Sequence, residues 1–124
     1  MRRRRVGIVA VLVAILGVCW FGLRQHNCHQ RNAAFGRQIE TIKQDARAQI
    51  KLGTTKSDVA RFFTEHNIPF SISESLASGF IQTSGCAPFG CGSDAAVINV
   101  RVRLNEAGAV TEEPKVVGIY TNCL

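Results

Sequence analysis

The feature that most constrains this chain is an apolar segment near its N-terminus, from Val6 to Leu23, which contains no charged side chain. As a helix, this segment would be about 27 Å long, close to the ~30 Å hydrocarbon core of a bilayer. It is apolar on every face, so it does not fit the surface of a small soluble domain. We therefore predict a transmembrane anchor over residues 6–23.

Two alternatives, cleavage and lipidation, stay open for this segment. A cleaved signal peptide usually has an apolar core of about 7–15 residues and a small-residue cleavage site, whereas this run is longer and no such site follows it. A lipoprotein signal would modify Cys19, but Val18 precedes it in place of Gly, Ala or Ser. Trp20 and Phe21 suit an interfacial aromatic belt better than a processed terminus. An uncleaved anchor is the favoured interpretation.

The charges at the two ends of the segment predict its orientation. Arg2 to Arg5 precede it, and only Arg24 and Arg31 follow closely. Because the more basic flank stays in the cytoplasm, the N-terminus is expected to be cytoplasmic. This predicts a single-pass protein of the bacterial inner membrane, with a cytoplasmic tail over residues 1–5 and a periplasmic C-terminal domain.

The formal charge of +6 does not indicate a nucleic-acid-binding protein. Of the 15 Lys and Arg residues, four are Arg2–Arg5, and the eleven from Arg24 onward are nearly balanced by 9 Asp and Glu. Nucleic-acid-binding domains carry clustered basic charge, and no basic run or aromatic-interleaved patch follows Arg24. The basic cluster is a topology signal, and no nucleic-acid partner is expected.

Four cysteines follow the apolar segment, and an even number in an oxidising compartment predicts two disulfides. They are Cys28, Cys86, Cys91 and Cys123. Pairing between the last two expected strands would bring Cys123 close to Cys91 or Cys86 and leave the other for Cys28. A local bond between Cys86 and Cys91 is the competing arrangement. Cys19, inside the apolar segment, is expected to be an inert apolar residue.

Two helices are expected after a juxtamembrane linker over residues 24–32. From Ala33 to Lys51 the apolar residues recur every three or four positions, which predicts an amphipathic helix. A second helix is expected over Thr54–His66. Its start is marked by Thr55 as N-cap and by Asp58 three residues later, a carboxylate at the positive end of the helix dipole.

After the second helix the apolar period changes from 3.6 to 2, which predicts strands. Turns are expected at Ser75–Ser78 and Asn105–Gly108, and a Gly-, Pro- and Ser-rich loop at Ser84–Asp94. The expected strands are Phe70–Ser73, Gly79–Thr83, Val97–Leu104 and Val116–Tyr120. The predicted fold class is α+β: an N-terminal transmembrane helix and then, over residues 33–124, two helices packed on an antiparallel three- to four-stranded meander.

No catalytic or metal site is expected. His26, Cys28 and His29 are three potential metal ligands, but they lack the paired spacing of a zinc site, so a solvated segment with one half-cystine is favoured. Ser93 and Asp94 lie in the loop without the motif of a hydrolase nucleophile. The two loop cysteines have four residues between them, unlike the C-x-x-C of redox enzymes. The chain is therefore predicted to be non-catalytic and to use no cofactor.

The segment Leu52–Val59, L-G-T-T-K-S-D-V, resembles the G-M-T-x-x-[DE]-V start of the second helix in small envelope proteins of the BamE type, also called SmpA/OmlA. Asn105–Val110 is similar to the D-x-x-G-x-V hairpin turn of the same family. The sequence departs from that family at Thr54, where Met is usual, and at Asn67–Pro69, in place of Gly-x-Pro. The resemblance implies a two-layer α+β fold and a role in the cell envelope, on a fold that also serves inhibitors and other binding domains.

The favoured function is a non-catalytic binding or scaffold domain held at the membrane by Val6–Leu23, with an envelope protein as its partner, in cell-envelope assembly or maintenance. The candidate contacts are aromatic side chains that could equally belong to the core: Phe80, Phe89 and Tyr120. The alternative is an inhibitor or immunity-like protein. In that case the Cys86–Cys91 loop would enter a cleft of the partner, with Phe89 at its tip.

Overall fold

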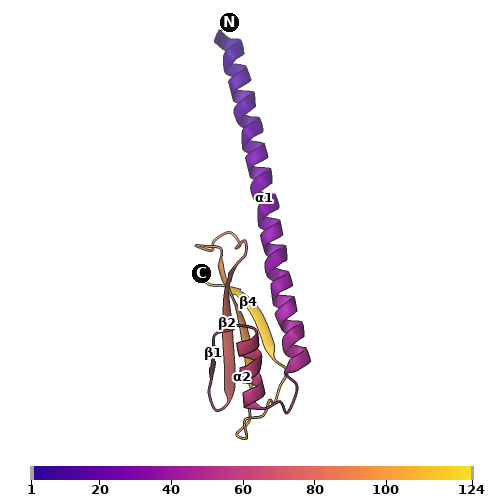
Figure 1. Cartoon of the computed structure of the whole chain (residues 1–124). Coiled ribbons are helices and arrows are strands. Elements are labelled where there is room, and N and C mark those ends of the chain that lie inside the picture. Colours follow the sequence, from indigo (N-terminus) through magenta and orange to yellow (C-terminus); the bar gives the residue numbers. More distant parts are fainter. Residues whose placement is uncertain (1, 124) are drawn as a thin grey trace.

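The computed structural model describes the backbone of residues 2–123 and the side chains of residues 7–123. It contains one long helix, one short helix and a four-stranded antiparallel sheet (Figure 1). The elements are α1 (Arg2–Gln49), α2 (Lys56–Glu65), β1 (Phe70–Ile72), β2 (Leu76–Ser84), β3 (Ala95–Arg103) and β4 (Lys115–Tyr120). The expected α+β class is confirmed.

The main departure from expectation lies in α1, which is a single helix of 48 residues. The expected juxtamembrane linker over residues 24–32 is instead helical, and it joins the apolar segment to the amphipathic helix, which ends at Gln49. No Gly or Pro interrupts this stretch. Extending an existing helix needs no new nucleus, so a polar stretch with no breaking residue continues it.

The N-terminal part of α1 has the character of a membrane span. Among the described residues, α1 is the one helix long and apolar enough to cross a membrane, by length and composition. Its large apolar side chains, from Ile8 to Leu23, are exposed. A core helix of a soluble domain would bury such side chains. This part of α1 therefore needs an apolar environment that the rest of the described chain does not supply.

The helix α2 begins as the sequence predicts. The Thr55 side chain accepts a hydrogen bond from the backbone N–H of Asp58, and the Thr55 hydroxyl donates to the Asp58 carboxylate at 2.7 Å. The cap satisfies one of the free N–H groups at the helix start. Three apolar side chains of α2 are buried: Val59, Phe62 and Phe63.

The sheet is a meander in the order β1-β2-β3-β4. Its first turn is earlier than expected, because Ile72 pairs with Ala77 and the residues from Leu76 onward already belong to β2. The Ser73 hydroxyl accepts a hydrogen bond from the backbone N–H of Leu76, which closes the chain directly after β1. The turn at Asn105–Gly108 lies where it was expected, with Gly108 at φ +73.

One hydrophobic cluster unites side chains from both helices with one face of the sheet. In β3 the buried residues alternate with less buried ones, as the period of 2 predicts. The approach between α1 and β4 is close: a Cβ at Gly118 would meet the side chains of Ile39 and Phe35. Figure 1 shows the C-terminal part of α1 beside β4 and α2 near β1 and β2.

Candidate functional site

The opposite face of the sheet exposes an apolar surface. Phe80 in β2 is 49 % exposed, and Val117 and Ile119 in β4 are 51 % and 47 % exposed. Antiparallel partners that stand opposite one another have their side chains on the same face. Phe80 stands opposite Asn99, and Asn99 opposite Val117. These residues therefore share one face across three strands.

The next row of the sheet extends this surface. Val97 of β3 stands between Gln82 of β2 and Ile119 of β4. The two rows together define what we call the open-face patch: Phe80, Val97, Val117 and Ile119. Strands that carry apolar residues on both faces are typical of sheets covered on both sides, so the apolar residues on the open face of β4 make this face a candidate docking surface.

Asn99 lies within the open-face patch and has an unmet hydrogen-bond requirement. Its Oδ1 is buried and has no hydrogen-bond partner within the described residues. A buried acceptor without a donor is costly, and such atoms in folded proteins are usually satisfied. Because the protein's own atoms already cover this oxygen, the exposed apolar side chains, and not this acceptor, make the patch a candidate docking surface.

One side of the open-face patch has a basic rim. Arg101 and Lys115 stand opposite each other in the row that follows Asn99 and Val117, and both are exposed. Arg103 and Lys115 lie 3.8 Å and 3.9 Å from carboxylate oxygens of Glu112. The face thus combines an apolar centre with a positively charged border.

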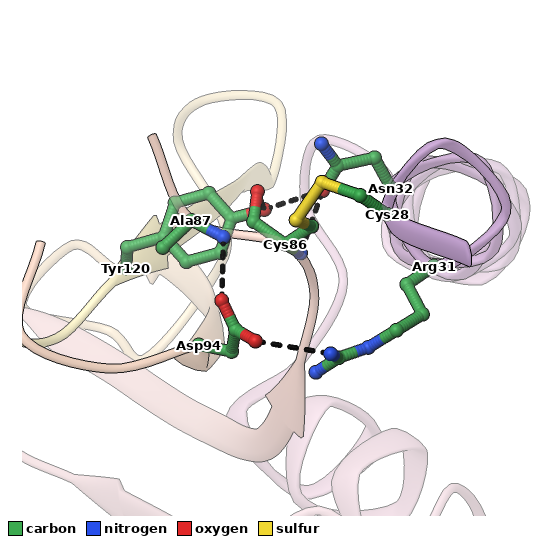
Figure 2. The surroundings of a disulfide bond; sticks show 7 residues. All are labelled: Cys28, Arg31, Asn32, Cys86, Ala87, Asp94 and Tyr120. Atoms are coloured by element: carbon green, nitrogen blue, oxygen red, sulfur yellow. Dashed lines mark hydrogen bonds and ion pairs between the residues drawn. A yellow bond between two sulfur atoms is a disulfide. The ribbon is translucent and has the colours of Figure 1, made fainter. Parts of the chain in front are cut away.

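A second candidate surface is the loop between β2 and β3. Phe89, at its tip, is fully exposed. Two disulfides hold the loop, Cys28–Cys86 and Cys91–Cys123. This is the pairing that places Cys123 with a loop cysteine, and the competing local bond between Cys86 and Cys91 is not formed. The Cys28–Cys86 bond ties the loop to α1 (Figure 2).

Asn32 of α1 fixes the start of this loop, a role that no local sequence pattern indicates. Its Oδ1 accepts hydrogen bonds from the backbone N–H of Cys86 at 2.8 Å and from the Tyr120 hydroxyl at 2.7 Å. The Tyr120 hydroxyl also lies 3.1 Å from the carbonyl oxygen of Cys86, and its ring packs 5.6 Å from that of Phe35. Tyr120 is therefore engaged inside the molecule, while Phe80 and Phe89 lie on two separate surfaces.

Asp94 fixes the other end of the loop. Its carboxylate accepts hydrogen bonds from the backbone N–H of Ala87 at 2.9 Å and from Arg31 Nη1 at 3.0 Å (Figure 2). The Ala87 N–H and then the positive charge of Arg31 hold the pKa of Asp94 below its usual value. The loop is therefore connected to α1 by an ion pair as well as by a disulfide.

Two of the three histidines, His66 and His26, and the loop serine Ser93 contact neighbouring polar groups. His66 at the end of α2 has Nδ1 3.0 Å from the carbonyl oxygen of Phe62 and Nε2 3.4 Å from the Asp45 carboxylate. His26 contacts Gln30, one turn along α1. Ser93 Oγ accepts from the side-chain amide of Asn122. Within residues 2–123, no three His, Cys, Asp or Glu side chains come together as a metal site.

The comparisons with known proteins add no assignment. No protein-family model, no curated protein and no solved structure matches the chain.

Proposed function

We propose that this protein is a non-catalytic binding domain anchored in the bacterial inner membrane, and that it docks an envelope protein on its open-face patch. Residues 6–23 of α1 span the membrane with the N-terminus in the cytoplasm, and the α+β domain lies in the periplasm. The observation that carries the proposal is the open-face patch, where the apolar side chains of Phe80, Val117 and Ile119 are about half exposed on one face of the sheet.

The proposed location is supported by three features. The apolar side chains of α1 up to Leu23 are exposed, as they are in a helix that faces lipid. Four arginines precede this part of α1. Two disulfides cross-link the domain that follows it, and such bonds persist in oxidising compartments such as the periplasm.

The proposed site is supported by the division of the sheet into two faces. We take α1 and α2 as one layer over the face that carries Ile98 and Val100, which are buried. The open-face patch then has no covering element from the described chain. Its basic rim suits a partner that presents apolar side chains beside acidic ones. The envelope role itself rests on the resemblance of Leu52–Val59 to proteins of the BamE type.

Site-specific photo-crosslinking in intact cells tests this function. A photoreactive amino acid at Val117 should yield a discrete protein adduct, and the substitution Phe80→Glu should abolish it. The matched control is Thr41→Glu, an exposed position on α1 that lies outside the patch and should leave the adduct unchanged. No adduct from Val117, or an adduct that is insensitive to Phe80→Glu, contradicts docking on this face.

The same experiment distinguishes docking on the open-face patch from the alternative function, that of an inhibitor or immunity-like protein that acts through its loop. Full exposure of Phe89 on a loop held by two disulfides is the observation that favours it. A crosslinker placed at Pro88 would then give the adduct, and Phe89→Ala would abolish it with the fold intact. An adduct that depends on Phe80 and not on Phe89 supports the open-face patch.

A further inference from the structure

The tip of the loop between β2 and β3 lies beside the last turn of the apolar part of α1. An open groove of about 1000 Å³ separates them. On the helix side it is lined by Trp20, Phe21 and Leu23, and on the loop side by Pro88 and Phe89. The loop tip therefore faces the end of the apolar segment across this groove.

The distances along α1 place this level in the headgroup layer of a bilayer. Cys28, which bonds Cys86 at the base of the loop, lies five residues beyond Leu23, or about 7.5 Å along the helix axis. The headgroup layer on each side of a bilayer is about 5–8 Å thick. If Leu23 ends the span, the disulfide lies at the outer edge of this layer, and the loop tip, which faces Trp20 to Leu23 across the groove, lies against this layer.

The chemistry of this region suits a lipid interface. Phe89 is fully exposed in the described structure, and the transfer of an exposed phenyl ring from water to a less polar interface is favourable. The Arg24 guanidinium lies 5.5 Å from the Trp20 ring centroid. Aromatic rings with a basic side chain beside them are typical of the boundary between the acyl chains and the headgroups.

The loop is held toward this level by bonds at both ends. The Cys28–Cys86 disulfide and Asn32 hold its start, and the ion pair between Asp94 and Arg31 holds its end. Because these connections all lead to α1, the position of Phe89 along the anchor is set before any lipid is met. A group that is held in its bound position loses little conformational entropy on binding.

We propose that Phe89 inserts into the headgroup layer of the outer leaflet, so that the domain has a second membrane contact beside α1. The ligand of this surface is phospholipid, with the ring at the boundary of the acyl chains. The inference rests on the proposed insertion of residues 6–23. It assigns the loop tip to the membrane, and it leaves the open-face patch free for a protein.

Lipid quenching of tryptophan fluorescence tests this proposal on the full chain. The native protein carries a single tryptophan, Trp20, which reports on the anchor. In a Trp20→Phe background, Phe89→Trp reports on the loop tip. Leu52→Trp is the matched control, because Leu52 is 69 % exposed and follows the end of α1 at Gln49, which lies about 32 Å farther along the helix axis than Cys28. Each protein is reconstituted into phosphatidylethanolamine–phosphatidylglycerol vesicles that contain a phospholipid with a spin label near its headgroup.

The proposal expects lipid quenching at positions 20 and 89 to be several-fold stronger than at position 52, with the reverse order for aqueous acrylamide. Quenching at position 20 but not at position 89 overturns the proposal and leaves the membrane anchor intact. Weak lipid quenching at position 20 overturns the proposed insertion of α1 and this inference with it. Mass spectrometry of the reconstituted proteins confirms that both disulfides are formed in each variant.

Discussion

Asp94 shows how one side chain controls the loop that carries Phe89. Its carboxylate accepts a hydrogen bond from the backbone N–H of Ala87 and pairs with Arg31, 63 positions away in the sequence. The sequence marks Asp94 only as a polar residue in a loop, because nothing in its local context indicates Arg31 or Ala87. The same is true of Asn32, whose partners are 54 and 88 positions away. Long-range polar contacts of this kind have no periodic signal.

The lowered pKa of Asp94 predicts a pH dependence for the loop. The carboxylate is favoured in the folded state, so its contribution to stability is fully present above the unfolded pKa, about 3.9, and is lost as the pH falls through the lower folded pKa. A carbon-13 NMR titration of the Asp94 carboxyl group should show this lowered pKa, and Arg31→Gln should raise it. The amide signal of Ala87 should follow the same titration. An identical titration in the wild type and in Arg31→Gln would contradict the ion pair.

At the residue scale, the candidate site was only partly predictable. The sequence predicts Phe80, Phe89 and Tyr120 as candidate contacts because they are aromatic, and Phe80 and Phe89 are indeed exposed. The hydroxyl and ring of Tyr120, by contrast, are used inside the molecule. Composition alone cannot separate these cases, because an aromatic side chain near a strand end serves a core or a surface equally well.

At the scale of the elements, period and capping signals predicted α2 and the strands with small errors at their ends. They did not predict that α1 is continuous. The stretch over residues 24–32 has no apolar stripe, so periodicity gives no helix signal there, and its helicity comes from the helices on either side. The first turn was also misplaced. Residues 76–78 do not alternate between apolar and polar side chains, so they give no strand signal, and the hydrogen bond between Ser73 and Leu76 closes the turn earlier.

The contact between α1 and β4 predicts that Gly118 tolerates no side chain. A Cβ at this position would lie 2.7 Å from Phe35 Cζ and would also meet Ile39, both on α1. We expect Gly118→Ala to lower the free energy of unfolding by about 1–3 kcal/mol, because the packed helix must shift to make room. Thermal unfolding in detergent, followed by near-ultraviolet circular dichroism, measures the loss.

The matched control for this substitution is Gly36→Ala on the exposed surface of α1, where a Cβ has no neighbour within 4 Å. Ala is a better helix former than Gly, so this variant should unfold at the same temperature or slightly higher. Equal effects of the two substitutions would show that α1 does not press against β4 as the structure has it.

At the scale of the whole molecule, the two disulfides join parts that the chain order separates. Cys28–Cys86 closes 58 residues and connects α1 to the loop, and Cys91–Cys123 closes 32 residues and connects the loop to the C-terminal end. The sequence indicated two bonds from the even count, and strand pairing favoured Cys123 with a loop cysteine. It left the choice between Cys86 and Cys91 open, because that choice depends on the side of the sheet along which α1 runs.

Removing the first disulfide should weaken the whole molecule. We expect Cys28→Ser with Cys86→Ser to lower the free energy of unfolding by about 2–4 kcal/mol, because the unfolded chain gains conformational freedom. The larger closed loop should make this loss about 0.5 kcal/mol greater than that from the Cys91–Cys123 pair. Chemical denaturation in detergent measures both. Cys19→Ser, at the free cysteine, is the control and should change nothing; a similarly small effect for the pair would contradict a stabilising role.

The unbroken course of α1 from the apolar segment to Gln49 has a mechanical consequence. An anchor joined to its domain by a flexible tether would let the domain swivel, but a continuous helix transmits torsion. If residues 6–23 span a bilayer, the direction in which the sheet faces around the helix axis is set by the number of residues between Leu23 and Cys28, the first residue that is bonded to the domain, and each added residue would turn it by about 100°. A neighbour embedded in the same membrane would always meet the same side of this protein.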